Sequence, residues 1–231
     1  GGGSSEVVGG ALLGDILAPA AAYVQRQVQQ LQHGQPAHPP AVHTSLGVPA
    51  HLPPFLAALC PHLPRSWQHE DTWGVLLQTE GTSAVVAAVH ALQQRCMHSP
   101  VVGVAACSYH GPPHSTYGSR CEHNVTKPPQ LCYPAPAACF RQSDEKEAPF
   151  LDRIAAEQEA WLEQHPEVGV LLVEPQWGSA SCGQPWPREL LQRFVKRARE
   201  RGILVVADEI MCGLGRHGQG RMFLVDAWDV E

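Results

Sequence analysis

The sequence predicts an α/β fold in which helices flank a parallel-rich sheet. From residue 73 onward, short apolar segments alternate with longer segments whose apolar residues have helical spacing. The short segments are continuous runs of Val, Leu, Ile and Ala rather than alternations of apolar and polar residues. Strands that are buried on both faces have this composition, which is typical of parallel sheets covered by helices. With 44% hydrophobic residues among 231, the chain has enough apolar material for such a core.

The predicted elements alternate regularly along the second part of the chain. Strands are expected at 73–78, 101–107, 168–174 and 203–208, and helices at 82–97, 151–165 and 187–202. The last helix has Pro187 at its start and Gly202 at its end, which are the preferred positions of these residues. Residues 112–149, rich in Pro, Cys and Ser, are predicted to form a long loop.

The first part of the chain, residues 1–70, is rich in Ala, Pro and His. Two helices are expected in it, at 21–32 and 51–63, the second entered through two prolines. We therefore predict a partly helical N-terminal segment, 1–70, followed by a partial cofactor-binding large domain, 71–231.

Composition argues against several classes of partner. The net charge of −6 and the lack of a basic patch argue against nucleic acid. None of the eight cysteines forms a C-x-x-C pair, so no metal site is expected, and the thiols are predicted to be reduced and mostly buried. No apolar run reaches roughly 18 residues, so no membrane span is expected. These observations predict a soluble intracellular protein and leave open whether its compartment is the cytoplasm or the mitochondrion.

Polar groups follow several of the predicted strands. Gly81 and Thr82 open a helix whose free N–H groups suit a phosphate, although Thr82 could also be a simple N-cap. After the next strand, Tyr109 could stack on a planar ligand and His110 could donate a hydrogen bond, or the pair could form a surface turn with an aromatic plug.

Two later strands end in acids. Glu174 follows an apolar strand, where a carboxylate is costly unless it is paired. Asp208 follows another, and its partner is either a ligand's cationic ring nitrogen or an arginine, Arg216 or Arg221. In parallel sheets, ligands gather at the carboxyl ends of the strands. A phosphate cradle, an aromatic ring and an acid at one edge match the needs of pyridoxal 5′-phosphate, whose ring acts as an electron sink when its nitrogen is protonated.

A G-x-G-x-x-G string at residues 213–218 offers a different interpretation, a nucleotide-binding oxidoreductase. In a dinucleotide-binding loop the first glycine follows the strand closely and a helix begins on the loop. Here Asp208 to Cys212 intervene, and no convincing helix follows. The nucleotide interpretation is therefore not favoured.

Four segments together resemble the class III aminotransferases of fold type I. "ADEIMCGLGRHG" (207–218) resembles their Asp-Glu-Val/Ile…Gly-x-Gly-Arg-x-Gly signature, and "EGTSAVVAAVHAL" (80–92) is similar to their Ser-Gly-Ser-Glu-Ala-Asn-Glu phosphate segment. "SYHG" (108–111) and "VEPQWG" (173–178) are similar to their Tyr-His-Gly and Glu-Pro-x-x-Gly segments. Order and spacing agree over roughly residues 73–228.

The resemblance implies the large domain of a pyridoxal-phosphate-dependent transferase. The resemblance also implies that the protein acts, when full length, as a homodimer that moves an amino group from an amino acid or ω-amine to a keto acid. Gly81 and Thr82 would hold the phosphate, Tyr109 would stack on the ring, Asp208 would bind its nitrogen and Ile210 would pack on the other face. The cofactor-binding residues expected on this basis are Gly81, Thr82, Tyr109, His110, Glu174, Asp208, Ile210 and Met211.

The sequence also departs from the family pattern. Ser83, Val86 and Ser179 stand where the family often has Glu, and Met211 stands where it often has Gln. The resemblance implies a Schiff-base lysine downstream of Asp208, whereas Lys127, Lys146 and Lys196 all precede it. We therefore expect an apparently truncated chain that is inactive by itself. The alternative is a non-catalytic relative that acts as a binding or subunit-interaction protein.

Overall fold

The computed structural model describes residues 52–64, 75–96, 101–112, 115–117, 130–178 and 183–230, together with residues 18, 22, 25–26, 28–30 and 32–33. The chain divides into two compact units, one formed by Gly1–Val75 with Leu214–Phe223 and the other by Leu76–Gly213 with Leu224–Glu231. The division into 1–70 and 71–231 stays a prediction of domain organisation. The second unit contains every strand of the described sheet.

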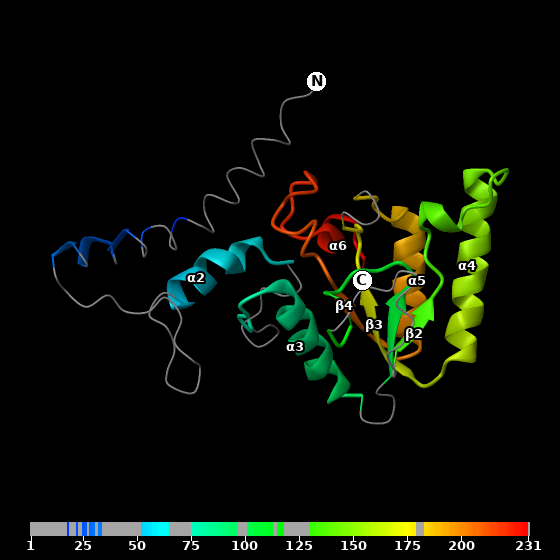
Figure 1. The fold of residues 1–231 in the computed structure, drawn as a ribbon, viewed down its shortest axis with the longest axis horizontal. Helices are drawn as coiled ribbons and strands as arrows, with labels where there is room; N and C mark the ends of the chain where they lie inside the picture. Colours follow the sequence, from blue (N-terminus) through cyan, green and yellow to red (C-terminus); the bar gives the residue numbers. More distant parts are fainter. Residues whose placement is uncertain are drawn as a thin grey trace, which may run out of the picture. The chain divides into compact units, whose positions relative to one another are not determined.

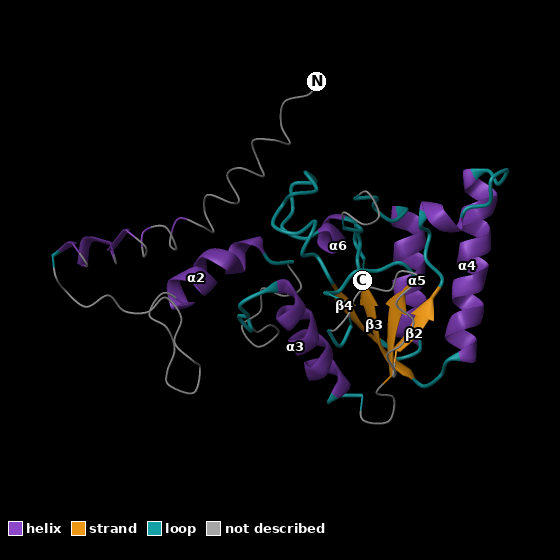
Figure 2. Ribbon diagram, in the orientation of Figure 1, coloured by secondary structure: helices purple, strands orange, loops and turns teal. Residues whose placement is uncertain are grey.

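The described strands form one parallel sheet (Figure 2). They are β1 (Val101–Ala105), β2 (Gln130–Tyr133), β3 (Val168–Val173) and β4 (Leu204–Ala207), and their order across the sheet is β2-β1-β3-β4. All three neighbouring pairs are parallel. Because β1, β3 and β4 are neighbours and point the same way, the segments that follow them lie at one edge of the sheet. The α/β class and the parallel sheet expected from the sequence are confirmed.

Helices cover both faces of this sheet (Figure 1). On one face lies α3 (Gly81–Gln93), and on the other lie α4 (Glu147–Gln164) and α5 (Arg188–Glu200). Alternate strand residues contact the two layers, as the two-residue period of a strand requires. Val102, Val104, Val170 and Leu172 pack with α3, whereas Leu171 and Val173 pack with α4 and α5. This arrangement explains why the strands are apolar throughout.

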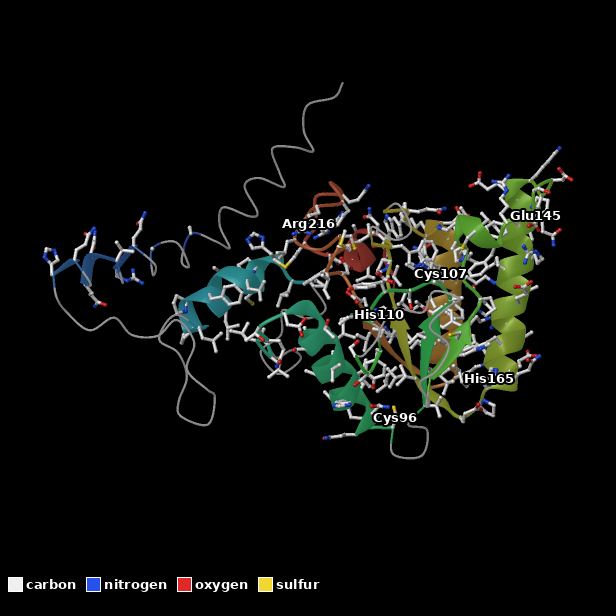
Figure 3. All side chains as sticks on the ribbon, in the orientation of Figure 1. Cys96, Cys107, His110, Glu145, His165 and Arg216 are labelled. Carbon is white, nitrogen blue, oxygen red and sulfur yellow. The ribbon has the colours of Figure 1, made fainter. Side chains whose placement is uncertain are left out.

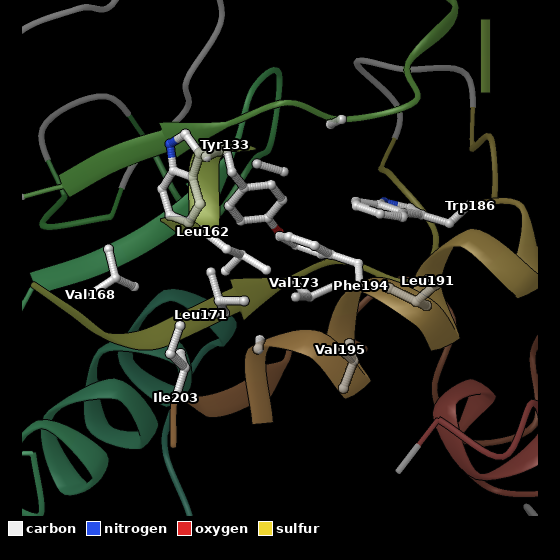
Figure 4. Close-up of a cluster of buried hydrophobic side chains, with 14 of the residues drawn as sticks. Tyr133, Leu162, Val168, Leu171, Val173, Trp186, Leu191, Phe194, Val195 and Ile203 are labelled. Carbon is white, nitrogen blue, oxygen red and sulfur yellow. The ribbon is translucent and has the colours of Figure 1, made fainter. Parts of the chain in front are cut away.

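The larger core lies between the sheet and the α4–α5 layer and is rich in aromatic rings (Figure 4). Tyr133, fully buried on β2, lies 4.9 Å from Phe194 and 5.7 Å from Trp161 between ring centroids. Its hydroxyl donates a 2.9 Å hydrogen bond to the backbone oxygen of Leu172. A buried tyrosine needs such a partner, and here it ties β2 to β3 across the intervening strand.

Local signals fix the ends of the covering helices. In α5 the buried residues recur at helical spacing, from Leu190 and Leu191 to Ala198. The helix ends in a Schellman arrangement: Gly202, with φ +76°, donates to Arg199 O, and Ile203 donates to Ala198 O. The glycine stop predicted from the sequence is therefore confirmed.

Several local predictions are wrong. Residues 75–78 form no strand, and Leu76 and Leu77 are 63% and 51% exposed, because this apolar run does not pair with the described sheet. The predicted loop 112–149 contains β2, a 3-10 helix at Ala138–Phe140 and the start of α4. Its Pro- and Cys-rich composition hid a strand of four residues.

The prediction that the thiols are mostly buried is also wrong for the described cysteines. They are free thiols, but only Cys212 is buried, while Cys132 and Cys139 are exposed. Cys121 and Cys182 lie outside the described residues.

The first unit is described mainly through its helix α2 (Leu52–Leu59), followed by a 3-10 turn at Cys60–His62. Leu59 and Leu63 pack with Met222, from the segment that returns to this unit. The expected helix at 51–63 is thus confirmed, and the described residues between 22 and 32 are also helical. In the described part of the chain, no helix has the length and apolarity needed to cross a membrane.

Gly103 on β1 provides a test of this packing. A Cβ atom there would lie 2.6 Å from Leu171 Cδ2 and 2.8 Å from Trp161 Cη2, so even alanine overfills the core. We expect Gly103→Ala to lower the free energy of unfolding by about 1–3 kcal/mol, measured by denaturant titration. Combined with Leu171→Val, its cost should be smaller than in the wild-type background. Full additivity of the two substitutions would contradict the close packing described.

Candidate active site

The segments after β1, β3 and β4 are tied together by hydrogen bonds at the carboxyl edge of the sheet. The backbone N–H of Tyr109 donates to Glu174 Oε2 at 2.7 Å, which links the β1 and β3 segments. The N–H of Asp208 donates to Val173 O at 2.7 Å, which links β4 to β3. His110 Nδ1 lies 2.8 Å from Asp208 Oδ2, which links the β1 and β4 segments across the end of β3. Three polar residues that are far apart in sequence therefore meet at one place.

The His110–Asp208 pair is almost completely buried; His110 is labelled in Figure 3. The side chains of His110 and Asp208 are 0% and 4% exposed, and Asp208 Oδ1 also accepts the N–H of Ile210 at 3.1 Å. A buried carboxylate is stable only when its oxygens are paired in this way. The partner of Asp208 is thus a histidine, not one of the arginines considered from the sequence.

His110 has a second nitrogen, Nε2, that is buried without a hydrogen-bond partner in the structure. Buried polar atoms usually have a partner, so an unpaired nitrogen beside a cavity indicates a position at which a ligand could bind. With Nδ1 fixed by Asp208, Nε2 is the ring atom left to make that contact.

Glu174 lies next to this pair and is 3% exposed. Burial raises the pKa of Glu174 to about 7; His110 and the N–H donors of Tyr109 and Gly178 oppose the rise, while the charge of Asp208 adds to it. Near neutral pH its carboxyl group therefore exchanges between its two protonation states.

A cavity of about 370 Å³ opens at this edge of the sheet. This volume is within the range of small-ligand sites. Tyr109, Ile210 and Met211 are each about half exposed, which leaves apolar and aromatic surface available to a ligand. The cavity is lined by all eight residues predicted from the sequence, Gly81, Thr82, Tyr109, His110, Glu174, Asp208, Ile210 and Met211, and also by Glu80, Gly111 and Gly178. The structure thus brings the predicted residues together, while their roles toward a ligand stay predictions.

Two glycines allow close approach of the segments around the cavity. A Cβ atom on Gly81 would lie 2.7 Å from Ile210 Cδ1, and one on Gly111 would lie 2.7 Å from Thr82 Oγ1. Gly111 also has φ +119°, a conformation that favours glycine. The loop after β1 therefore lies directly against the start of α3.

Glu80 is the residue that the sequence analysis missed at the start of α3. Its side chain accepts hydrogen bonds from the backbone N–H groups of Thr82 (3.1 Å) and Ser83 (2.8 Å), so Glu80, not Thr82, is the N-cap. An acid immediately before the first helical residue could have indicated this, because a carboxylate is favoured at a helix N-terminus.

The acid next to Asp208 has a structural role. Glu209 accepts the backbone N–H groups of Leu224 (2.7 Å) and Val225 (2.8 Å), at the start of the short helix α6 (Leu224–Ala227). Residues 210–217 form turns, Gly215 and the following Gly218 have positive φ, and no helix begins on residues 210–218. The G-x-G-x-x-G string is therefore a turn-rich connection to α6, not the opening of a dinucleotide-binding helix.

Comparison with known proteins identifies the family. The class-III aminotransferase family matches residues 23–231, and the chain belongs to it. The resemblance expected from the sequence is thereby confirmed, and nothing in the comparisons favours the non-catalytic alternative.

Individual relatives agree with this assignment. Acetylornithine aminotransferase of Mesorhizobium japonicum is 35% identical over 54 residues, which cover 23% of this chain and 13% of that protein. An ω-transaminase of Pseudomonas jessenii, solved in complex with PMP, is 26% identical, with a TM-score of 0.55 over 67% of this chain and 36% of that one. A transaminase from directed evolution by ancestral reconstruction has a TM-score of 0.68 over 93% of this chain and 47% of its own, at 17% identity, which supports the fold. The chain thus spans less than half the length of these relatives.

The pKa of Glu174 gives a test of its burial. A carboxyl group with a raised pKa in the folded protein contributes stability below its ordinary value of 4.5, and this contribution is lost as the pH rises to about 7. Relative to Glu174→Gln, the wild-type protein should lose up to about 3 kcal/mol of unfolding free energy between pH 4.5 and 7, at about 1.4 kcal/mol per pKa unit. Denaturant titrations at several pH values measure this difference.

The matched control for this test is Glu189→Gln, at an exposed position in the first turn of α5. Its stability over the same pH range shows how much the same substitution contributes at an exposed position. A Glu174→Gln curve parallel to that of the control would show that Glu174 ionises like an exposed residue.

Proposed function

We propose that this chain carries the cofactor site of a class III aminotransferase that uses pyridoxal 5′-phosphate. The observation that carries the proposal is the cavity at the carboxyl edge of the sheet. There the Asp208–His110 pair, the half-exposed Tyr109 ring and the start of α3 line the same space. Family membership and a neighbour solved with PMP support the same cofactor.

The ring end of the cofactor fits the residues present. Asp208, kept in place by His110 and the N–H of Ile210, would hold the protonated pyridine nitrogen through its buried carboxylate. Tyr109 and Ile210 offer exposed apolar surface for the two faces of the ring. When bound, the cofactor supplies an electron sink for the substrate's Cα electrons. The part of this chain is to maintain a negative charge beside the ring nitrogen and to orient the ring.

The substrates that we propose are an amino-acid or amine donor and a keto-acid acceptor, and the full-length protein is proposed to be a homodimer. We further propose that these 231 residues do not catalyse amino transfer on their own. Two of the three lysines are described: Lys146 precedes α4 and Lys196 lies on α5, and neither lines the cavity. We therefore propose that neither Lys146 nor Lys196 is the catalytic lysine.

Asp208→Asn tests the assignment of the ring-nitrogen partner. Loss of a charged hydrogen bond worth about 1.5–3 kcal/mol should weaken binding of pyridoxamine 5′-phosphate about 10- to 100-fold, measured by isothermal titration calorimetry. Pyridoxamine 5′-phosphate has no aldehyde, so reaction with surface lysines does not disturb the measurement.

The control is Asp226→Asn, on α6 and outside the cavity lining, which should leave binding within about twofold of the wild type, or ~0.4 kcal/mol. A thermal melt of each variant confirms that it is folded. Equal weakening by the two substitutions would remove Asp208 from the site.

Lysine chemistry provides a second test. We expect that pyridoxal 5′-phosphate followed by borohydride reduction labels this chain diffusely and below one equivalent at each lysine, because neither described lysine lines the cavity. Peptide mapping measures the distribution of label. A single stoichiometric adduct at Lys127 or Lys146 would contradict the proposed absence of a catalytic lysine.

A further inference from the structure

The carboxylate of Glu80 is hydrogen-bonded to the first turn of α3. Besides the backbone N–H groups of Thr82 and Ser83, it accepts the Ser83 hydroxyl at 2.6 Å. These hydrogen bonds, that of the Ser83 side chain first, lower the pKa of Glu80, so the side chain is an anion at neutral pH. The start of α3 therefore already has a bound negative group.

One of these donors, the N–H of Thr82, is also one that the proposed function requires for the cofactor's phosphate, which the family resemblance assigns to Gly81 and Thr82. A phosphate at a helix N-terminus is held by the free N–H groups of the first turn. Here Glu80, Gly81 and Thr82 all line the cavity. His110, with its buried and unpartnered Nε2, lines it too, so this end of α3 belongs to a ligand cavity and is not an ordinary capped helix.

Two anions cannot share the N–H of Thr82. Each N–H group makes one good hydrogen bond, and two negative charges a few ångströms apart repel each other. The family segment that residues 80–92 resemble begins with serine, a small neutral side chain, where this chain has Glu80. The substitution therefore changes the charge at the helix start, while Gly81 and the hydroxyl at Thr82 are kept.

We propose that Glu80 is an internal anion that occupies the phosphate position, so that a phosphate-bearing ligand binds only after the Glu80 side chain leaves the start of α3. This inference rests on the proposed function, whose cavity it refines. Glu80 is exposed, so its side chain has room to rotate into water. Leaving the helix costs the hydrogen bonds of the cap, and this cost lowers the affinity for the phosphate.

Three ligands separate the phosphate end from the ring end: pyridoxamine 5′-phosphate, pyridoxamine and inorganic phosphate. We expect Glu80→Ser to tighten binding of both phosphate-bearing ligands about tenfold, since about 1.4 kcal/mol corresponds to that factor, and to leave pyridoxamine unchanged. Glu80→Gln, which keeps the shape and an acceptor but removes the charge, should give a smaller gain. Titration calorimetry on the 231-residue chain measures all three ligands.

The control variant is Glu147→Gln, an exposed acid in the first turn of α4 and outside the cavity lining, which should change no affinity. Thermal melts show whether loss of the cap unfolds the Glu80 variants. Glu80→Gln provides the binding result if Glu80→Ser does not fold.

The outcomes separate this inference from the proposed function. If wild type and both Glu80 variants bind the phosphate ligands equally, or none binds them, the inference is wrong. If the variants bind inorganic phosphate more tightly than the wild type, but no form of the chain binds pyridoxamine or pyridoxamine 5′-phosphate, the inference stands and the cofactor assignment fails. Gains confined to the two phosphate-bearing ligands support both.

Discussion

The buried pair of His110 and Asp208 is the interaction on which the architecture of the site depends. A carboxylate at the end of a buried strand is costly unless its oxygens are paired, and breaking a buried pair typically costs about 3–5 kcal/mol. The partner comes from the segment after β1, two strands away in the sheet, so the 2.8 Å contact spans the end of β3. It fixes the position of His110, and with it that of Tyr109 next in sequence.

The acidic residues at this edge of the sheet have different roles. Glu209 is used to hold the start of α6, whereas Asp208 turns to His110 and the cavity. Glu174 follows β3, the strand between those that precede His110 and Asp208. Its pKa is raised mainly by burial, and it accepts a hydrogen bond from the N–H of Tyr109. His110 thus pairs with Asp208 and also opposes the rise in the pKa of Glu174, while its Nε2 is buried without a hydrogen-bond partner in the structure.

The sequence predicts the parts of this arrangement that follow from periodicity and strand ends. Continuous apolar runs identify β1, β3 and β4 because both of their faces are covered, and parallel strands bring their carboxyl ends together. Composition does not identify β2, because four residues flanked by prolines have no distinct period. Composition also predicts a strand at 73–78, wrongly for the described residues 75–78, because this segment is as apolar as the true strands but does not pair with the described sheet. The partner of Asp208 could not be read from the sequence either, because a contact over 98 residues depends on strand order.

The charge of the residues that line the cavity bears on which ligands it favours. Gly81 and Gly111 allow the close backbone approach that a phosphate cradle needs. Yet three of the residues lining the cavity carry carboxyl groups, Glu80, Glu174 and Asp208, against one imidazole. A carboxylate favours a protonated pyridine or amine beside it and opposes a phosphate. If the cofactor binds as proposed, the carboxylates of Glu174 and Asp208 favour its cationic part, while Glu80 at the start of α3 opposes its phosphate. On the proposed function, affinity for the cofactor depends on both contributions, and the Glu80 side chain lowers the one at the phosphate end.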